Sequence, residues 1–253
     1  MQKNTNQPKN KIVSRIVTVV ALSVFLYAAY GLTDVLIDYY KNRQMIANVQ
    51  EMYYETEIEE DRAPNEIRSG FDELLKHNND VVGWITIDGT QIDYPILQST
   101  NNIDYLTKDY NNRETRAGSI FLDFRNEIAT ENKNTVVYGH RMKDGSMFQH
   151  LTKFLNEDFL KKHQTFEYDT LYDSYEAEIF SVYNTLTDFN YIQTEFSDEA
   201  KYADLLEKMK NKSKYQTDVD VNYDDEIITL STCDYVLDEN EGRLVVHAKL
   251  TKK

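Results

Sequence analysis

Residues Ile227–Cys233, with the sequence IITLSTC, are the stretch that says most about the fold. Four of the seven residues are β-branched, and β-branched side chains favour extended strands over helices. We therefore expect a strand over 226–232 that ends at Cys233. A cysteine at the end of a strand can face both a cleft and the solvent. Alone, it could equally be a small buried side chain, the usual place of a free cysteine.

Arg243 follows Cys233 by ten residues and opens a second expected strand, Leu244–Leu250. This spacing fits two neighbouring antiparallel strands joined by a short loop, so the guanidinium group should lie beside the thiol. A guanidinium group stays charged and carries five donors. It could hold a carbonyl or a developing oxyanion. Read alone, Arg243 is a surface arginine that pairs with Glu239 or Glu241.

His140 comes directly after another expected strand, Thr135–Tyr138. Gly139 lies between them, and we expect this glycine to permit an unusual backbone turn. The strand would hold His140 rigidly while leaving it open to a cleft, although alone it reads as a surface loop histidine. His247 is its competitor, and its place inside the last strand favours a packed or hydrogen-bonded role. The other histidines lie in polar or helical surroundings: His77, His150 and His163.

The rest of the pattern is rich in short strands. A hairpin is expected around the turn at Asp88 and Gly89. Helices are expected over 64–77, 147–155, 158–162 and 197–211, the last with Ser197 as its N-cap. Many short strands without regular intervening helices favour a barrel or a sandwich over a parallel sheet. The fold class is therefore mostly β with peripheral helices (α+β). The expected strands are 82–87, 91–97, 119–123, 135–138, 166–168, 175–183, 226–232 and 244–250.

The N-terminal region contains an uncharged run, Ile16–Thr33, preceded by four basic residues and no acidic one. As a helix it would be roughly 27 Å long, close to the hydrocarbon thickness of a bilayer. We expect a cytoplasmic tail over 1–15 and a transmembrane anchor over 16–33, since basic flanks stay inside. A cleaved signal peptide, cut near Ala28, Ala29 or Gly31, is the alternative. Either assignment exports the remaining chain.

Charge and cysteine content restrict what the exported part does. We divide it into a helical stalk over 34–63 and an extracellular domain over 64–253. It carries 24 basic and 43 acidic residues, which excludes a nucleic-acid partner because phosphate contacts need clustered basic groups. The single cysteine excludes an intramolecular disulfide and a zinc site of several cysteines. An unpaired thiol outside the cell favours a reactive role.

Cys233, His140 and Arg243 are more specific together than apart, because a cysteine with a distant histidine is typical of thiol acyl-transfer enzymes. The stretch TLSTC (229–233) with the downstream arginine resembles the signature of the sortase family. So do YGH (138–140) and the following MKDGSMF (142–148). The resemblance covers about residues 64–250. It is strongest to class B, because helices precede both the first strand and the cysteine strand.

The resemblance implies an eight-stranded β-barrel, with Cys233, His140 and Arg243 in one groove, on a Gram-positive cell surface. It implies a single-pass membrane protein with its N-terminus in the cytoplasm. The substrates would be secreted proteins with a C-terminal sorting motif of the Asn-Pro-Gln-Thr-Asn type. Cys233 would attack the Thr carbonyl, His140 would act as general acid and base, and Arg243 would stabilise the oxyanion.

A peptidoglycan precursor amine would then accept the Thr carboxyl group. Candidate substrate-binding residues are Ser231, Thr232 and Tyr138, and neither a metal nor a cofactor is expected. Two alternatives stay open. One is a cell-wall thiol peptidase that hydrolyses its substrate. The other is an anchored, non-catalytic β-domain that binds a surface partner and keeps Cys233 buried and inert.

Overall fold

The computed structural model describes residues 7–55, 66–128, 130, 132–233, 237–238 and 240–253. The chain divides into two compact units, residues 1–43 and residues 44–253. In chain order the elements are α1 (Gln7–Tyr54), the 3-10 helix η1 (Ser69–Phe71), α2 (Asp72–His77), β1 (Val81–Thr86), β2 (Asp93–Leu97), α3 (Asp104–Thr107), β3 (Ile120–Leu122), β4 (Asn134–Tyr138), the 3-10 helix η2 (Phe148–Leu155), α4 (Glu157–Lys162), β5 (Thr165–Thr170), β6 (Ser174–Leu186), α5 (Glu199–Lys212), β7 (Ile227–Cys233) and β8 (Gly242–Lys252).

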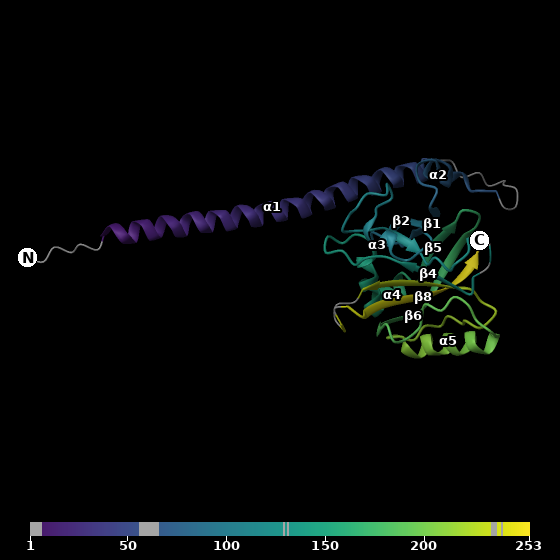
Figure 1. Cartoon of the computed structure of the whole chain (residues 1–253). Coiled ribbons are helices and arrows are strands. Elements are labelled where there is room, and N and C mark those ends of the chain that lie inside the picture. The colour runs from purple at the N-terminus through teal and green to yellow at the C-terminus, as the bar shows by residue number, and fades with distance from the viewer. Residues whose placement is uncertain (1–6, 56–65, 129, 131, 234–236, 239) are drawn as a thin grey trace, which may run out of the picture. The chain divides into compact units, whose positions relative to one another are not determined.

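The first unit is the N-terminal part of α1 (Figure 1). Its most apolar 18-residue window has a mean hydropathy of 2.1, and none of that window is buried. By length and composition this helix is able to cross a membrane. The expectation of a long apolar helix near the N-terminus is therefore confirmed.

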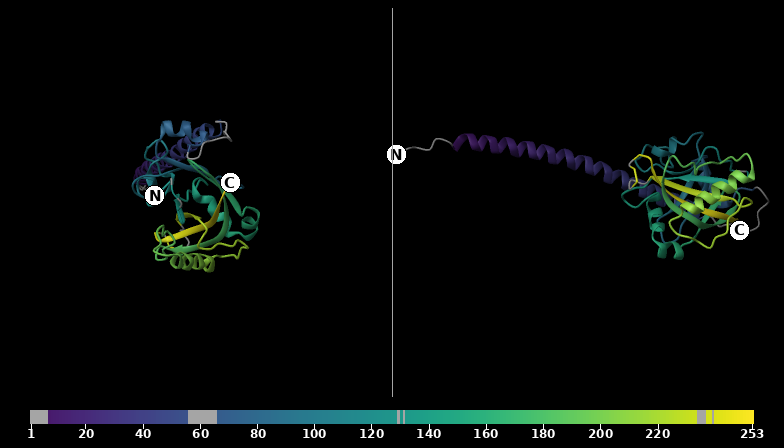
Figure 2. Two further views of the ribbon diagram at one scale, coloured as in Figure 1. Left: turned by 90° about the vertical axis from the view of Figure 1, so that its right-hand side faces the viewer. Right: turned by 90° about the horizontal axis from the view of Figure 1, so that it is seen from below.

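The second unit is a closed barrel with the strand order β1-β2-β3-β4-β7-β8-β6-β5 (Figures 1 and 2). The choice that the sequence left open, barrel or sandwich, is thus settled in favour of an eight-stranded barrel. Two neighbouring pairs, β2 with β3 and β4 with β7, are parallel. Because β4 and β7 run in the same direction, their carboxyl ends meet at the same rim of the barrel.

The end of α1 belongs to this second unit. Met45, Val49 and Tyr53 are buried in a cluster with Trp84 of β1. The rings of Tyr53 and Trp84 stack with their centroids 4.1 Å apart. The compact unit therefore begins within the segment that the sequence assigned to the stalk. Residues 56–65, including the expected helix start at Pro64, lie outside the described residues.

The strand β7 has two different faces. Ile227 lies on the same face as Thr229, Ser231 and Cys233, because side chains alternate along a strand. Ile227 belongs to the apolar cluster that α5 forms with the barrel, together with Val245 of β8. This face of β7 is therefore covered by α5 at one end and carries the cysteine at the other.

The expected N-cap of the helix before the cysteine strand is wrong. The N-cap of α5 is Asp198 rather than Ser197, since the Asp198 carboxylate accepts a hydrogen bond from the Lys201 backbone N–H. A carboxylate is the better acceptor next to the positive end of a helix dipole. The short helical piece expected over 147–155 is confirmed as the 3-10 helix η2, which begins one residue later.

Candidate active site

Three strand ends bring the predicted reactive residues together. In the parallel ladder Tyr138 of β4 lies opposite Ser231 of β7, and the Gly139 N–H continues the ladder to the Ser231 carbonyl at 3.2 Å. His140 thus emerges beside Cys233, the last residue of β7. In the antiparallel ladder Cys233 lies directly opposite Arg243 of β8. The predicted neighbourhood of Cys233 and Arg243 is confirmed.

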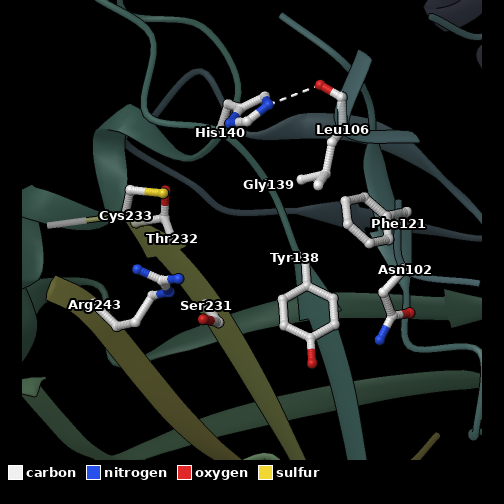
Figure 3. Close-up of a pocket in the computed structure, with 10 residues that line it drawn as sticks. All are labelled: Asn102, Leu106, Phe121, Tyr138, Gly139, His140, Ser231, Thr232, Cys233 and Arg243. Atoms are coloured by element: carbon white, nitrogen blue, oxygen red, sulfur yellow. Dashed lines mark hydrogen bonds between the residues drawn. The ribbon is translucent and has the colours of Figure 1, made fainter. Parts of the chain in front are cut away.

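These residues line a cavity of about 250 Å³ (Figure 3). All six candidate site residues from the sequence border it, together with Gly139 and three residues that the sequence did not single out. Among the residues that the structure describes, no group of three or more His, Cys, Asp or Glu side chains is placed to hold a metal ion. The lining residues are Asn102, Leu106, Phe121, Tyr138, Gly139, His140, Ser231, Thr232, Cys233 and Arg243.

His140 is half-buried, and its ring makes two contacts. Its Nε2 lies 2.7 Å from the Leu106 carbonyl oxygen (Figure 3). A carbonyl oxygen only accepts, so Nε2 carries a proton in this arrangement. The hydrogen bond to the Cys233 side chain raises the pKa of His140 above its ordinary value, burial opposes this shift, and the bond to Leu106 adds to it. The histidine is therefore biased towards the charged form next to the thiol.

Gly139 is required by close packing and not by the unusual backbone turn that the sequence predicted. Its φ angle is not positive, so no unusual turn explains the glycine. Instead, a Cβ atom there would lie 2.4 Å from Cδ1 of Ile120 and 2.9 Å from the ring of Phe148. The Phe148 backbone N–H also donates to the His140 carbonyl at 2.8 Å. Close packing around Gly139 thus fixes the backbone that carries His140.

Cys233 is the single cysteine of the chain, so it has no disulfide partner within it, and its exposure is intermediate. The Nη1 atom of Arg243 donates to the carbonyl oxygens of Asn240 at 2.9 Å and Gly242 at 2.8 Å. These backbone contacts hold the guanidinium group on the cavity side of β8, close to Cys233 (Figure 3). Of the two acidic partners considered for Arg243, Glu239 lies outside the described residues.

Asp123 organises the opposite side of the cavity, and sequence reasoning missed it. Its fully buried carboxylate accepts hydrogen bonds from the Tyr138 hydroxyl at 2.8 Å and from Asn102 Nδ2 at 2.9 Å. Arg125 adds a bidentate contact at 2.8 and 2.7 Å. Burial raises the pKa of Asp123, but the hydrogen bonds outweigh it and leave that pKa below its ordinary value. The carboxylate therefore stays charged and fixes Tyr138 and Asn102.

His247 lies in the core rather than at the cavity, as its sequence context indicated. It is fully buried, and its ring nitrogens lie 2.7 Å from the Tyr183 hydroxyl and 2.8 Å from the Thr229 hydroxyl. Burial lowers the pKa of His247 to about 3, so the ring is neutral at any ordinary pH. His140 is thus the histidine that the fold offers to Cys233.

Comparison with known proteins gives a consistent result. The family profile described as "Sortase domain" matches residues 85–251. A protein named sortase B from Listeria monocytogenes is 46% identical over 236 residues, which are 93% of this chain and 96% of the relative. A protein of the same name from Staphylococcus aureus is 38% identical over 238 residues, 94% of this chain and 95% of the relative.

Solved structures agree with the sequence relatives. The crystal structure of sortase B from Bacillus anthracis in complex with AAEK1 has a TM-score of 0.80 and 48% identity. The match covers 87% of this chain and all of that one. The Staphylococcus aureus sortase B–substrate complex has a TM-score of 0.77 and 37% identity, with 85% and 99% coverage.

Proposed function

The chain belongs to the sortase family, in its class B, whose members are cysteine transpeptidases, and we propose that Cys233, His140 and Arg243 carry this reaction here. One observation carries the proposal. The thiol of Cys233 is hydrogen-bonded to a histidine whose pKa is raised by that contact, within a cavity that Arg243 also lines. A thiol next to a cationic imidazole is the arrangement that nucleophilic catalysis by cysteine needs.

In the acylation half, the Cys233 thiolate attacks the Thr carbonyl carbon of a sorting motif, and a C–S bond forms. The scissile C–N bond then breaks, and the leaving amine takes a proton from the His140 imidazolium. The thiolate and imidazolium coexist in only part of the population near neutral pH, so the free enzyme is slow. Arg243 offers its guanidinium group to the developing oxyanion.

In the second half, an acceptor amine attacks the thioester carbonyl while neutral His140 takes up its proton. A new amide bond forms, the C–S bond breaks, and Cys233 leaves as the thiolate beside the His140 imidazolium, the pair with which acylation began. The acceptor we propose is the amine of a peptidoglycan precursor, and the sorting motif is of the Asn-Pro-Gln-Thr-Asn type on secreted proteins. The family's action on sorting signals and cell-wall amines supports both.

The three candidate substrate-binding residues differ in whether their hydroxyl groups already have a hydrogen-bond partner. Ser231 Oγ already lies 2.9 Å from the Tyr191 hydroxyl, and the Tyr138 hydroxyl donates to Asp123. Thr232 Oγ1 is buried, and no hydrogen-bond partner for it lies among the described residues. We therefore assign Thr232 the substrate contact, and Ser231 and Tyr138 the shaping of the cavity.

The apolar helix supports a membrane location for this reaction. We propose that residues 16–33 span the membrane of a Gram-positive cell, that 1–15 stay in the cytoplasm and that the barrel lies outside. Residues 1–15 contain four basic residues and no acidic one, which favours this orientation.

The test uses the full chain in detergent with a panel of Thr-containing sorting peptides, with and without an amine acceptor, and with Cys233→Ala alongside. The proposal expects peptide ligated through its Thr carboxyl group to the amine. Hydrolysed peptide that no amine diverts would instead make the protein a thiol peptidase. If no peptide is turned over and the thiol resists alkylation until the protein unfolds, the protein is instead an anchored, non-catalytic β-domain that binds a surface partner.

A further inference from the structure

The segment formed by residues 191–193 connects β6 to α5 and lies in neither a strand nor a helix. Its three successive carbonyl groups all accept hydrogen bonds from side chains. Asn134 Nδ2 donates to the Tyr191 carbonyl at 3.0 Å and to the Gln193 carbonyl at 2.9 Å. Arg125 Nη2 donates to the Ile192 carbonyl at 2.9 Å. Two side chains therefore determine where this irregular backbone lies.

The 191–193 segment reaches the reactive groups through Tyr191. This side chain is buried, and its hydroxyl lies 2.9 Å from Oγ of Ser231. Ser231 lines the cavity two residues before Cys233, on the same face of β7. Burial raises the pKa of Tyr191, so its hydroxyl is neutral, and Arg243 and Cys233 lie close enough to influence that pKa in opposite directions. A shift of this segment would consequently move Tyr191 and change the hydrogen bond that it makes to Ser231 in the cavity wall next to Cys233.

A chain of buried polar groups fixes the amide of Asn134. Its Oδ1 accepts from the Thr229 hydroxyl at 2.7 Å. That hydroxyl proton is then used, so Thr229 Oγ1 accepts from Nδ1 of His247, and His247 Nε2 accepts from the Tyr183 hydroxyl. A flipped amide would place its oxygen against two carbonyl oxygens. The orientation with Nδ2 towards the 191–193 segment is therefore the one that satisfies every group.

Arg125 is fixed in the same way from the other side. Its guanidinium group is paired with the buried Asp123 carboxylate. This carboxylate also holds Tyr138 and Asn102, which line the cavity. Arg125, which holds the Ile192 carbonyl, therefore belongs to the same hydrogen-bonded cluster as Tyr138 and Asn102 of the cavity wall.

We propose that Asn134 and Arg125 are positioning residues for the transpeptidase: together they clamp the 191–193 backbone and so set the place of Tyr191, whose hydroxyl meets the Ser231 side chain beside Cys233. Neither residue lines the cavity, so both act through the segment that they hold. The inference rests on the proposed function, because its consequence is measured on acylation of Cys233.

The experiment compares acylation of the full chain in detergent with that of Asn134→Asp, which replaces the two-hydrogen donor and keeps an acceptor for Thr229. Asn78→Asp is the matched control. Asn78 is a buried amide whose Nδ2 donates to the Tyr110 carbonyl at 2.8 Å and whose Oδ1 accepts from the Asp80 N–H at 2.9 Å, away from the 191–193 segment and the cavity. We expect Asn134→Asp to lower kcat/KM roughly 10- to 100-fold, mainly through kcat, with Asn78→Asp close to wild type.

Alkylation of Cys233 by iodoacetamide supplies a second readout. Its rate and pH profile should stay unchanged in Asn134→Asp, since β4 and β7 hold His140 and Cys233 through their own ladder. Thr229→Ser, which keeps the hydroxyl, should retain acylation while Thr229→Val loses it. This pair keeps the test decisive if Asn134→Asp does not fold.

Three results would overturn the clamp: wild-type acylation in Asn134→Asp, an equal loss in Asn78→Asp, or equal behaviour of the two Thr229 variants. A wild-type chain that no peptide acylates would instead refute the proposed function, so the two failures are distinguishable.

Discussion

Acidification should destabilise the protein through His247 in particular. Burial holds the folded-state pKa at about 3, against an ordinary value of 6.5. Between these values the unfolded chain binds a proton that the folded protein does not. A lowered folded pKa means that this stability is fully present above pH 6.5 and is lost as the pH falls.

The size of this effect follows from the linkage relation. Each pH unit below 6.5 removes about 1.4 kcal/mol from the free energy of unfolding, so the loss between pH 7.5 and pH 5 is about 2 kcal/mol. The raised pKa of His140 acts in the opposite direction, whereas the lowered pKa of His150 acts in the same one. Both groups remain in a His247→Gln variant, so they cancel when the variant is compared with wild type.

The assay is urea unfolding at pH 7.5, 6 and 5 of a fragment that begins at Asp34, for wild type and His247→Gln. Fluorescence of Trp84, the single tryptophan, reports unfolding because its buried ring stacks on Tyr53. We expect the stability advantage of wild type over the variant to shrink by about 2 kcal/mol from pH 7.5 to pH 5. An advantage that stays constant across this range would refute the assignment of a neutral, buried imidazole.

Three further predictions concern the cavity. Gly139→Ala should cost roughly 1–3 kcal/mol of stability in a denaturant titration and slow acylation, since the new Cβ meets Ile120 and Phe148; an unchanged variant would contradict the packing argument. Arg243→Ala should lower kcat for acylation about 10²- to 10³-fold without slowing alkylation of Cys233, and a purely KM effect would remove the oxyanion role. Asp123→Asn removes the buried charge that accepts hydrogen bonds from Tyr138, Asn102 and the half-exposed Arg125, and should cost about 1–3 kcal/mol, measured by thermal unfolding; wild-type stability would show that these contacts do not depend on the carboxylate.

The sequence predicted the strands and the neighbourhood of the reactive groups well, for clear physical reasons. β-branched runs such as Ile227–Cys233 dictate extended backbone locally. The nine residues between Cys233 and Arg243 are enough for a short loop between neighbouring strands, and the structure pairs the two directly. His140 could be placed beside them through the resemblance, which implied one shared groove.

Other features depend on contacts that no local pattern encodes. Asn102 lies in a loop and Leu106 in the short helix α3, both far from His140 in sequence, and they reach the cavity through tertiary packing. Asp123 reads as the polar end of a strand until the fold surrounds it with donors. The reason for Gly139 also became clear only once Ile120 and Phe148 were seen against it.

The end of α1 illustrates the same limit. Its apolar residues are too scattered to distinguish a solvated stalk from a docked helix, whereas the structure buries Tyr53 against Trp84. The N-cap at Asp198 instead of Ser197 is a smaller case, in which two adjacent residues both satisfy the pattern.

The most direct test of the central claim, that Cys233 is the nucleophile, is the intact mass of the protein incubated with an Asn-Pro-Gln-Thr-Asn peptide. We expect a mass increase equal to the peptide up to and including Thr, less one water. The increase should be absent in Cys233→Ala and should disappear when an amine acceptor is added. An adduct that persists in Cys233→Ala would place the chemistry elsewhere in the molecule and contradict the mechanism.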